Sequence, residues 1–229
     1  MIGIIGAMSV EVKSLISLLS DKTVERISGV DYYRGKLTGK EVVVAKCGIG
    51  KVFAAMCCQT MILKYQPELI INTGIAGGLV SSLAVNDLVI ADSLVQHDFD
   101  TSALGDVGGL IIGTGRVYIP CAKKLVKAFA QAADRLNFSY RIGRIASGDQ
   151  FIADVKRAQK IVKQFKALAC EMEGAALAQI CYVNKVDFIV IRCISDITDG
   201  KSHLNLVFTT KKAAQQSLKL LAEFIAHYE

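Results

Sequence analysis

The sequence predicts an α/β protein built on a mixed sheet, and three observations support this class. Short apolar runs of strand length alternate with amphipathic stretches of helix length along the whole chain. The runs are rich in Ile and Val, which is typical of strands covered on both faces. Five runs end in a carboxylate or a glycine-rich turn, and ligands of such sheets bind at the carboxyl ends of the strands. We therefore expect one pocket at that edge, for a small neutral or cationic molecule.

The five runs supply the acids and glycines of the expected pocket. They cover residues 2–5 before Glu11, 42–45 before Gly48, 69–71 before Gly74, 168–170 before Glu173 and 188–194 before Asp196. Acids that converge with closely approaching backbone in one pocket indicate an enzyme.

The N-terminal part of the chain is expected to contain a strand, a helix and a hairpin. An amphipathic helix over residues 9–19 follows the first run, with Ser9 as its N-cap. Strands over residues 32–37 and 41–46 flank a turn at Gly39 and form a β-hairpin. This hairpin makes the sheet mixed rather than purely parallel.

Helices and strands then alternate to the end of the chain. The expected helices cover residues 52–65, 120–136, 154–165, 174–184 and 209–227, and the expected strands cover residues 69–72, 88–91, 142–146, 167–170 and 188–194. The segment 98–118 contains five glycines and no clear period. We expect it to be a mobile loop or a region that contacts a partner.

Size and composition predict a single domain, residues 1–229, outside membranes. The chain has 229 residues, enough for one substantial core, and no linker-like stretch divides it. Its mean hydropathy is +0.39, yet charged residues interrupt every apolar segment well short of the roughly 20 residues that span a membrane. Met1 leads directly into a strand-like run without a signal-peptide pattern, so we expect a cytoplasmic protein.

Cysteines, histidines and charge argue against a metal site and against nucleic acid as a partner. The seven cysteines stand in apolar surroundings and form no C-x-x-C pair, and the chain has three histidines. Buried free thiols are therefore expected, rather than disulfides or a zinc site. The net charge of +6 is spread along the chain without interleaved aromatic residues, so no nucleic-acid partner is expected.

The region from Glu171 to Asp196 carries the strongest local signal. Glu173 falls where an apolar run gives way to an Ala-rich helix, and the next run contains one cation, Arg192. The connection has the length of a parallel crossover, so Glu173 and Asp196 are expected at the ends of neighbouring strands. A buried cation needs a partner, which predicts that Arg192 pairs with Glu171, Glu173 or a carboxylate facing the ligand. Taken singly, each residue also fits a structural role, as a helix-terminal acid, a turn former or an ion pair.

Two glycine-rich segments show no nucleotide-cofactor pattern. The segment Gly48-Ile49-Gly50-Lys51 lacks the spacing of a P-loop and the third glycine of a dinucleotide fingerprint. Neither ATP nor NAD, nor any other cofactor, is therefore expected. Residues 72–78 contain three glycines after a strand and are expected to leave room for a ligand against the backbone. Close packing between a helix and the strand is the alternative.

These segments, taken in order, carry a resemblance to a known family. The matching motifs are Met-Ile-Gly-Ile-Ile-Gly-Ala-Met at residues 1–8, Cys47-Gly48-Ile49-Gly50-Lys51-Val52, Ile71-Asn72-Thr73-Gly74, Ala76-Gly77-Gly78-Leu79, Ser147-Gly148-Asp149, Phe151-Ile152, Glu171-Met172-Glu173, Ser195-Asp196 and Ser202-His203-Leu204. Over almost its whole length the sequence resembles the bacterial 5'-methylthioadenosine/S-adenosylhomocysteine nucleosidases.

The resemblance implies a fold, an assembly and a ligand class. The fold would be that of the nucleoside phosphorylases, a three-layer α/β structure in which helices flank a twisted mixed sheet with a barrel-like core. The assembly would be a homodimer. The partner molecule would be a small adenine nucleoside, and no metal would be required.

The resemblance also implies two catalytic residues and two contacts to the sugar. Asp196 would protonate N7 of the adenine, and Glu11 would activate the water that attacks C1' of the ribose. Glu173 would accept hydrogen bonds from the ribose hydroxyls, with Met172 packed against the sugar.

The remaining implied contacts surround the base and the sugar. Phe151 would stack on adenine, and the backbone of Ile152 would recognise its edge. Ala76 and Gly77 would line the base site. The other expected substrate-binding residues are Met8, Ile49, Arg192 and Ser195.

The chemistry fits these residue types independently of the family. Adenine leaves poorly as an anion, so cleavage needs a proton on the base, and nearby carboxylates stabilise the oxocarbenium-like centre. A general acid and a general base are the two carboxylates of inverting glycoside hydrolysis. Asp196 must then hold a proton near neutral pH, while Glu11 stays ionised.

The sequence departs from the family pattern near the sugar. Ile75 stands where familiar members have a serine, and Leu206 replaces an aromatic residue near the 5' side. Thr101, Leu104 and Ile112, in the segment that the family sends into the partner's pocket, also differ. The expected reaction is hydrolysis of the N-glycosidic bond in methylthioadenosine, adenosylhomocysteine or 5'-deoxyadenosine, and the preferred 5' substituent stays open.

Three alternatives remain at this point. An aminodeoxyfutalosine nucleosidase would share the adenine base and the chemistry. A purine nucleoside phosphorylase would replace water by phosphate, but such enzymes place arginines in the glycine-rich loops, where this chain offers only Lys51. A non-catalytic nucleoside sensor would not need a water-activating base such as Glu11.

Overall fold

The computed structural model describes residues 1–198 and 206–228. The strands are β1 (Ile2–Gly6), β2 (Ser20–Ile27), β3 (Val30–Leu37), β4 (Lys40–Lys46), β5 (Leu69–Gly78), β6 (Leu88–Gln96), β7 (Ile119–Pro120), β8 (Tyr140–Ser147), β9 (Ala169–Glu171) and β10 (Asp187–Ile197). The helices are α1 (Ser9–Ser17), α2 (Lys51–Tyr65), α3 (Lys123–Arg135), α4 (Val155–Phe165), α5 (Gly174–Asn184) and α6 (Leu206–His227). Two short 3-10 helices, η1 (Ser102–Leu104) and η2 (Ile112–Thr114), lie between β6 and β7.

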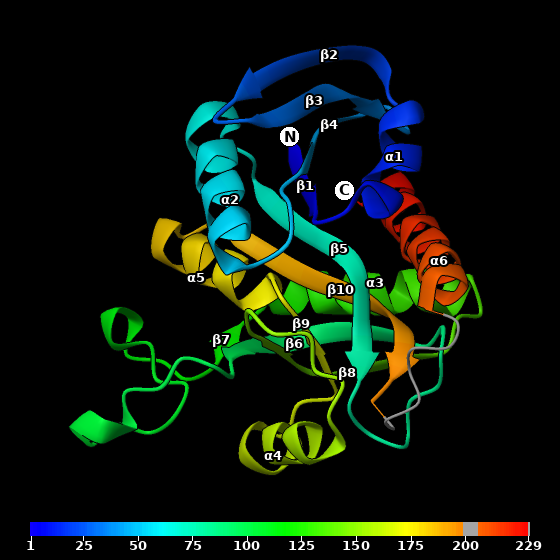
Figure 1. Ribbon diagram of the computed structural model, residues 1–229. Helices are drawn as coiled ribbons and strands as arrows, with labels where there is room; N and C mark the ends of the chain where they lie inside the picture. The colour runs from blue at the N-terminus through cyan, green and yellow to red at the C-terminus, as the bar shows by residue number, and fades with distance from the viewer. Residues whose placement is uncertain (199–205, 229) are drawn as a thin grey trace.

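In the described part of the chain all ten strands belong to one mixed sheet. Their hydrogen-bonded order is β10-β6-β8-β9-β5-β1-β4-β3-β2, with β7 paired to β6. A further pairing between β10 and β5 closes the five strands β5, β10, β6, β8 and β9 into a ring. The strands β1, β4, β3 and β2 extend the sheet beyond this ring, toward the top of Figure 1. The expected twisted mixed sheet with a barrel-like core is thus confirmed.

Helices cover the sheet on both sides and complete the expected three layers. Helices α2 and α5 pack against each other on one side, and α1 and α6 pack against each other on the opposite side (Figure 1). Helix α3 lies next to α6, where Phe129 and Phe224 stack with their ring centroids 4.0 Å apart. The strands between these layers are largely apolar and buried, as the sequence pattern indicated.

Most predicted elements exist, and their ends follow from local chemistry. Helix α5 has the predicted bounds, and α4 begins after Asp154, whose side chain accepts a hydrogen bond from the backbone N–H of Arg157 at 2.8 Å. The helix predicted from residue 120 begins at Lys123, because Ile119 and Pro120 pair with β6 as β7.

The prediction that Ser9 caps α1 is wrong. Ser9 is already helical and Met8 is the N-cap residue. The carboxylate of Glu11 accepts the backbone N–H groups of Ala7 and Met8 and so satisfies the start of the helix. Glu11, which the sequence analysis expects only in the pocket, therefore also stabilises the start of α1.

Strand β2 was not predicted, because its pattern contains no buried face. Residues 20–26 are all exposed and Ile27 is half-buried. The strand exists through its antiparallel pairing with β3. Hydrophobic alternation, the main sequence signal for a strand, is absent here.

The predicted end of a strand at residue 72 is also wrong. Strand β5 continues to Gly78, because it pairs with β10 along its whole length. The glycines serve close packing inside this strand: a Cβ on Gly78 would lie 2.7 Å from the Ile197 side chain, and one on Gly74 would lie 2.5 Å from Glu11 Oε1. Residues 72–78 thus form a wall of the sheet rather than a turn.

Glu173 follows β9 and Asp196 lies in β10, and these two strands are not neighbours, contrary to the prediction. Strand β5 lies between β9 and β10, and β9 runs antiparallel to β5 while β10 runs parallel to it. Gly77 of β5 pairs with Cys170 on one side and with Asp196 on the other. The ends of β9 and β10 therefore lie on opposite sides of β5.

Three further expectations can be placed. All seven cysteines are buried and free. No helix in residues 1–198 and 206–228 is both long and apolar enough to span a membrane. The motif Ser202-His203-Leu204 and the side chain of Leu206 lie outside the described residues.

Candidate functional site

A cavity of about 210 Å³ opens where the strands of the ring and β1 end. Its lining comes from the turns after β1, β4, β8 and β9, from the last residues of β5, β9 and β10, and from α1 and α6. The lining residues are Ala7, Met8, Glu11, Ile49, Ile75, Ala76, Gly77, Phe151, Cys170, Glu171, Met172, Glu173, Ser195, Asp196 and Thr210. The three acids that the sequence predicts for one pocket all line this cavity.

Most of the predicted site residues line the cavity, and two do not. Those that do are Glu11, Asp196, Met8, Ile49, Ala76, Gly77, Phe151, Met172, Glu173 and Ser195. The side chain of Ile152 is buried in a small apolar cluster beside α4, so only its backbone remains a candidate for recognition. Arg192 lies 2% exposed behind the acids of the cavity.

Glu11 is held by the backbone around it. Its Oε2 accepts hydrogen bonds from the N–H groups of Ala7 at 2.7 Å and Met8 at 2.8 Å, and its Oε1 accepts one from Ile75 at 3.1 Å. Gly74 provides the space that the carboxylate occupies. Three fixed donors thus orient this carboxylate at the cavity wall.

Asp196 stands at an irregularity of β10. The pairing register with β5 shifts between Ile194 and Asp196, which makes Ser195 the extra residue of a β-bulge. The Ser195 hydroxyl donates a hydrogen bond to Asp196 Oδ1 at 2.6 Å. Successive side chains of a regular strand point to opposite faces, but here both Ser195 and Asp196 line the cavity.

A buried ion-pair network supports Glu173 from behind. The Arg192 guanidinium donates to Glu171 and, at 2.5 Å, to Asn72 Oδ1, and it lies 4.0 Å from Glu173 Oε2. The Ser147 hydroxyl donates to the other oxygen of Glu171. The predicted pairing of Arg192 with these acids is confirmed.

The environment raises the pKa of both Glu11 and Glu173. Burial is the main cause in each case, and the Arg192 cation and backbone N–H donors oppose it. For Glu173 the nearby Glu171 adds to the effect of burial, and the pKa rises to about 7. Two of the cavity acids therefore bind protons more readily than ordinary glutamates.

Several lining residues were not on the predicted list. Glu171 appeared in a motif but without a site role, and Cys170 precedes it in β9. Thr210 comes from α6, far along the chain, and no local pattern connects it to the other residues. Ile75 was noted only as a departure from the family pattern, although its backbone N–H holds Glu11.

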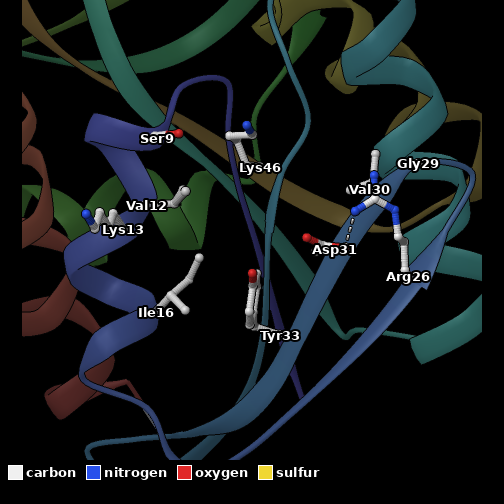
Figure 2. Close-up of a pocket in the computed structure, with 10 residues that line it drawn as sticks. All are labelled: Ser9, Val12, Lys13, Ile16, Arg26, Gly29, Val30, Asp31, Tyr33 and Lys46. Carbon is white, nitrogen blue, oxygen red and sulfur yellow. Dashed lines mark hydrogen bonds and ion pairs between the residues drawn. The ribbon is translucent and has the colours of Figure 1, made fainter.

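A larger cavity, of about 340 Å³, lies on the other side of α1 (Figure 2). Ile16 faces it from the helix and Tyr33 faces it from β3, while Arg26 and Asp31 form an ion pair at 3.4 Å on its rim. That pair is exposed, and Glu11 and the other acids of the smaller cavity do not line this one. Size alone thus does not locate the reactive groups.

Comparisons with known proteins agree on one family. The model of the Phosphorylase superfamily matches residues 1–226. The chain is 40% identical over 228 residues to a 5'-methylthioadenosine/S-adenosylhomocysteine nucleosidase of Shewanella loihica. These residues make up 99% of each of the two chains. It is similar to the structure of S-adenosylhomocysteine nucleosidase from Streptococcus pyogenes in complex with 5-methylthiotubericidin, with a TM-score of 0.95 and 34% identity, over 100% of this chain and 97% of that chain. It is also similar to the futalosine hydrolase of Helicobacter pylori, with a TM-score of 0.93 and 35% identity over 98% and 96% of the two chains.

Glu173→Gln is expected to stabilise the folded protein above pH 7 and to lose this advantage in acid. The carboxyl pKa is about 7 in the folded protein, against 4.5 without its surroundings. Between these values the folded state binds more protons than the unfolded state, so stability falls as the pH rises. Above about pH 7 the folded protein carries the full free-energy cost of an ionised Glu173, on the order of 1 to 3 kcal/mol. Glutamine does not ionise and avoids this cost.

Urea denaturation of both proteins at about pH 5 and about pH 8 measures this difference. The exposed Glu41, which pairs with Arg34 on the surface, provides the control Glu41→Gln. A gain in the free energy of unfolding that is equal at the two pH values would contradict the raised pKa of Glu173.

Proposed function

The chain belongs to the phosphorylase superfamily and, within it, to the 5'-methylthioadenosine/S-adenosylhomocysteine nucleosidases, and from this premise we propose how its residues divide the reaction. It is an N-ribosyl hydrolase that converts 5'-substituted adenine nucleosides to adenine and the free ribose derivative. The observation that carries the proposed mechanism is the gathering of Glu11, Glu173 and Asp196 around one cavity.

Glu11 is proposed as the general base for the attacking water. An ionised carboxylate has about four acceptor positions, and backbone N–H groups occupy three of them. The remaining position is available for a water in the cavity. The raised pKa makes Glu11 a stronger base than an ordinary glutamate, while the three donors favour its ionised form.

Asp196 is proposed as the general acid that protonates N7 of adenine. The β-bulge turns it into the cavity, and the Ser195 hydroxyl orients one of its oxygens. Protonation makes adenine a neutral leaving group, and the electron pair of the N-glycosidic bond then stays with the base. The water adds its oxygen to C1', and Glu11 takes the proton that this water loses.

Glu173 and its neighbours are proposed to hold the sugar and the base. The carboxylate of Glu173 would accept the ribose hydroxyls, which favours its ionised form over the protonated one. Met172 lies beside it in the lining. Arg192 is proposed to act from behind, by keeping Glu171 and Glu173 in place, rather than by touching the substrate.

The base and the 5' substituent would contact an apolar wall. Phe151, Ala76 and Gly77 are proposed at the base, together with the backbone of Ile152, and the other apolar lining residues Met8, Ile49 and Ile75 complete the wall. The similarity to a futalosine hydrolase keeps 6-amino-6-deoxyfutalosine as a second candidate substrate.

The charges of the cavity favour water over phosphate as the nucleophile. Among the described residues no Lys or Arg lines it, whereas four carboxylates do. Lys51, the one cation of the glycine-rich turn, donates to Asp98 at 2.7 Å and to Gln96 at 3.1 Å. A phosphate dianion would therefore meet repulsion from these carboxylates and, in the part of the chain that the structure describes, no cationic side chain in the lining.

Adenine release from 5'-methylthioadenosine is expected to proceed at an undiminished rate in phosphate-free buffer. The products should be adenine and the free 5'-methylthioribose, both measured by chromatography. Added phosphate should leave the rate and the products unchanged. Dependence of cleavage on phosphate, with formation of a ribose 1-phosphate, would show a phosphorylase instead.

Asp196→Asn is expected to reduce kcat on the order of a hundredfold or more, because general acid catalysis is typically that large. The amide retains the shape of the side chain and an oxygen acceptor for Ser195, so folding and nucleoside binding should persist. The exposed Asp21, which pairs with Lys36 on the surface, provides the control Asp21→Asn. Near-normal turnover of Asp196→Asn would end the assignment.

We also propose a homodimer, because seven exposed apolar residues belong to elements on one side of the protein. They lie on α2 (Val52, Phe53, Leu63), on α5 (Val183) and on the segment between β6 and β7 (Leu104, Val107, Ile112). Figure 1 shows that segment extending away from the sheet on the side of α2 and α5. Apolar side chains gathered in this way mark an interaction surface.

The mass in solution tests the assembly. Light scattering after size-exclusion chromatography should give twice the mass of the chain, and Leu104→Asp should shift the equilibrium toward the monomer. A monomer that is fully active under the same dilute conditions would rule the dimer out.

A single domain over residues 1–229 and a cytoplasmic location remain proposals. The first is supported by the one sheet that all described strands share.

A further inference from the structure

We propose that Lys51, Asp98 and Asp149 form a clamp that positions the mouth of the nucleoside cavity, an inference that rests on the function proposed above. The three residues come from the start of α2, the turn after β6 and the turn after β8. Neither Lys51 nor Asp98 nor Asp149 lines the cavity. Their effect on the reaction would therefore act through the residues next to them in the chain.

Three hydrogen bonds close the clamp into a circuit. Lys51 Nζ donates to Asp98 Oδ1 at 2.7 Å, and the backbone N–H of Asp149 donates to Asp98 Oδ2 at 2.9 Å. The backbone N–H of Lys51 donates to Asp149 Oδ1 at 2.8 Å. Each of the three segments is thus tied to both of the others.

The ion pair inside the clamp is shielded from water. The side chains of Lys51 and Asp98 are 18% and 17% exposed, whereas those of a surface pair on the same helix, Lys64 and Glu25, are 48% and 47% exposed. Burial acts to raise the pKa of Asp98, but the hydrogen bonds from Lys51 and Asp149 lower it overall. Exposed pairs contribute little because water screens them, so the clamp is the stronger of the two contacts.

The clamp holds the two cavity residues that packing holds least. Ile49 and Phe151 are 54% and 55% exposed, although both line the cavity. Ile49 precedes Lys51 by two positions, and Phe151 follows Asp149 by two positions. Since few contacts fix these side chains, their positions depend on the backbone to which the clamp is attached.

The clamp also reaches Glu173 through Gly50. The backbone N–H of Gly50 donates to Glu173 Oε1 at 2.9 Å. Gly50 has φ of 101°, a conformation that suits glycine, and a Cβ there would lie 3.1 Å from Asp149 Oδ1. A shift of Lys51 would therefore displace a donor of the carboxylate that is proposed to bind the sugar.

Loss of the clamp is expected to weaken substrate binding more than the chemical step. Glu11 and Asp196 belong to α1 and β10, not to the three segments that the clamp joins. A mobile mouth must be ordered when substrate binds, and that ordering lowers affinity. KM should therefore rise while kcat changes little.

The test compares three variants in the release of adenine from 5'-methylthioadenosine. Lys51→Met should raise KM on the order of tenfold and change kcat by less than about threefold. Lys51→Arg keeps the charge and should recover most of the affinity. Lys64→Met, on the exposed pair of the same helix, is the control and should match the unaltered enzyme.

A second variant and a binding measurement keep the test decisive. Asp149→Ala removes the acceptor of the Lys51 backbone N–H and should raise KM in the same direction, so it replaces Lys51→Met if that variant does not fold. An unchanged KM in the folded variants, or an equal rise in Lys64→Met, would overturn the clamp.

Calorimetry with a non-hydrolysable adenine nucleoside analogue should show the same loss of affinity in Lys51→Met. Equal affinity of the unaltered enzyme and Lys51→Met would also overturn the clamp. If the unaltered enzyme released no adenine, the proposed function would fail, and the calorimetric comparison would still decide the clamp.

Discussion

The buried guanidinium of Arg192 is the interaction on which the site depends. A cation inside a sheet is costly unless acids and carbonyl groups surround it, and here Glu171, Asn72 and Glu173 do so. Glu171 in turn accepts the backbone N–H groups of Glu173 and Gly174 and so fixes the start of α5. Arg192 also opposes the effect of burial on the pKa values of Glu11 and Glu173. One cation thus allows several buried carboxylates to lie close together.

The closed ring of strands gives these carboxylates a common cavity. Strand β5 pairs with β9 on one side and β10 on the other, which brings Cys170 and Asp196 to opposite sides of Gly77. The glycines of β5 leave room for the acids, and a Cβ on Gly74 would lie 2.5 Å from Glu11 Oε1. The bulge at Ser195 then presents two successive side chains to the cavity. The strand pairing, the glycines of β5 and the bulge at Ser195 together determine how the acids are arranged around the cavity.

The arrangement of charges around the cavity is the basis of the proposed preference for hydrolysis over phosphorolysis. In the described part of the chain, two cations near the cavity pair with acids: Arg192 with Glu171, and Lys51 with Asp98. The same engagement that removes Lys51 as a phosphate ligand makes it a tether between three turns. The proposals on the nucleophile and on the mouth of the cavity thus share the side chain of Lys51.

The sequence by itself determined the local elements and the chemical groups of the site. Periodic patterns located α4 and α5, the turn at Gly39 located the hairpin, and the ends of apolar runs identified Glu11, Glu173 and Asp196. These signals work because they arise between residues close in the chain. Only the tertiary structure decided that β5 separates β9 from β10, that exposed β2 is a strand, and that Thr210 and Glu171 face the same cavity. Strand partners and shared cavities are set by contacts between residues distant in the chain, and no single segment records them.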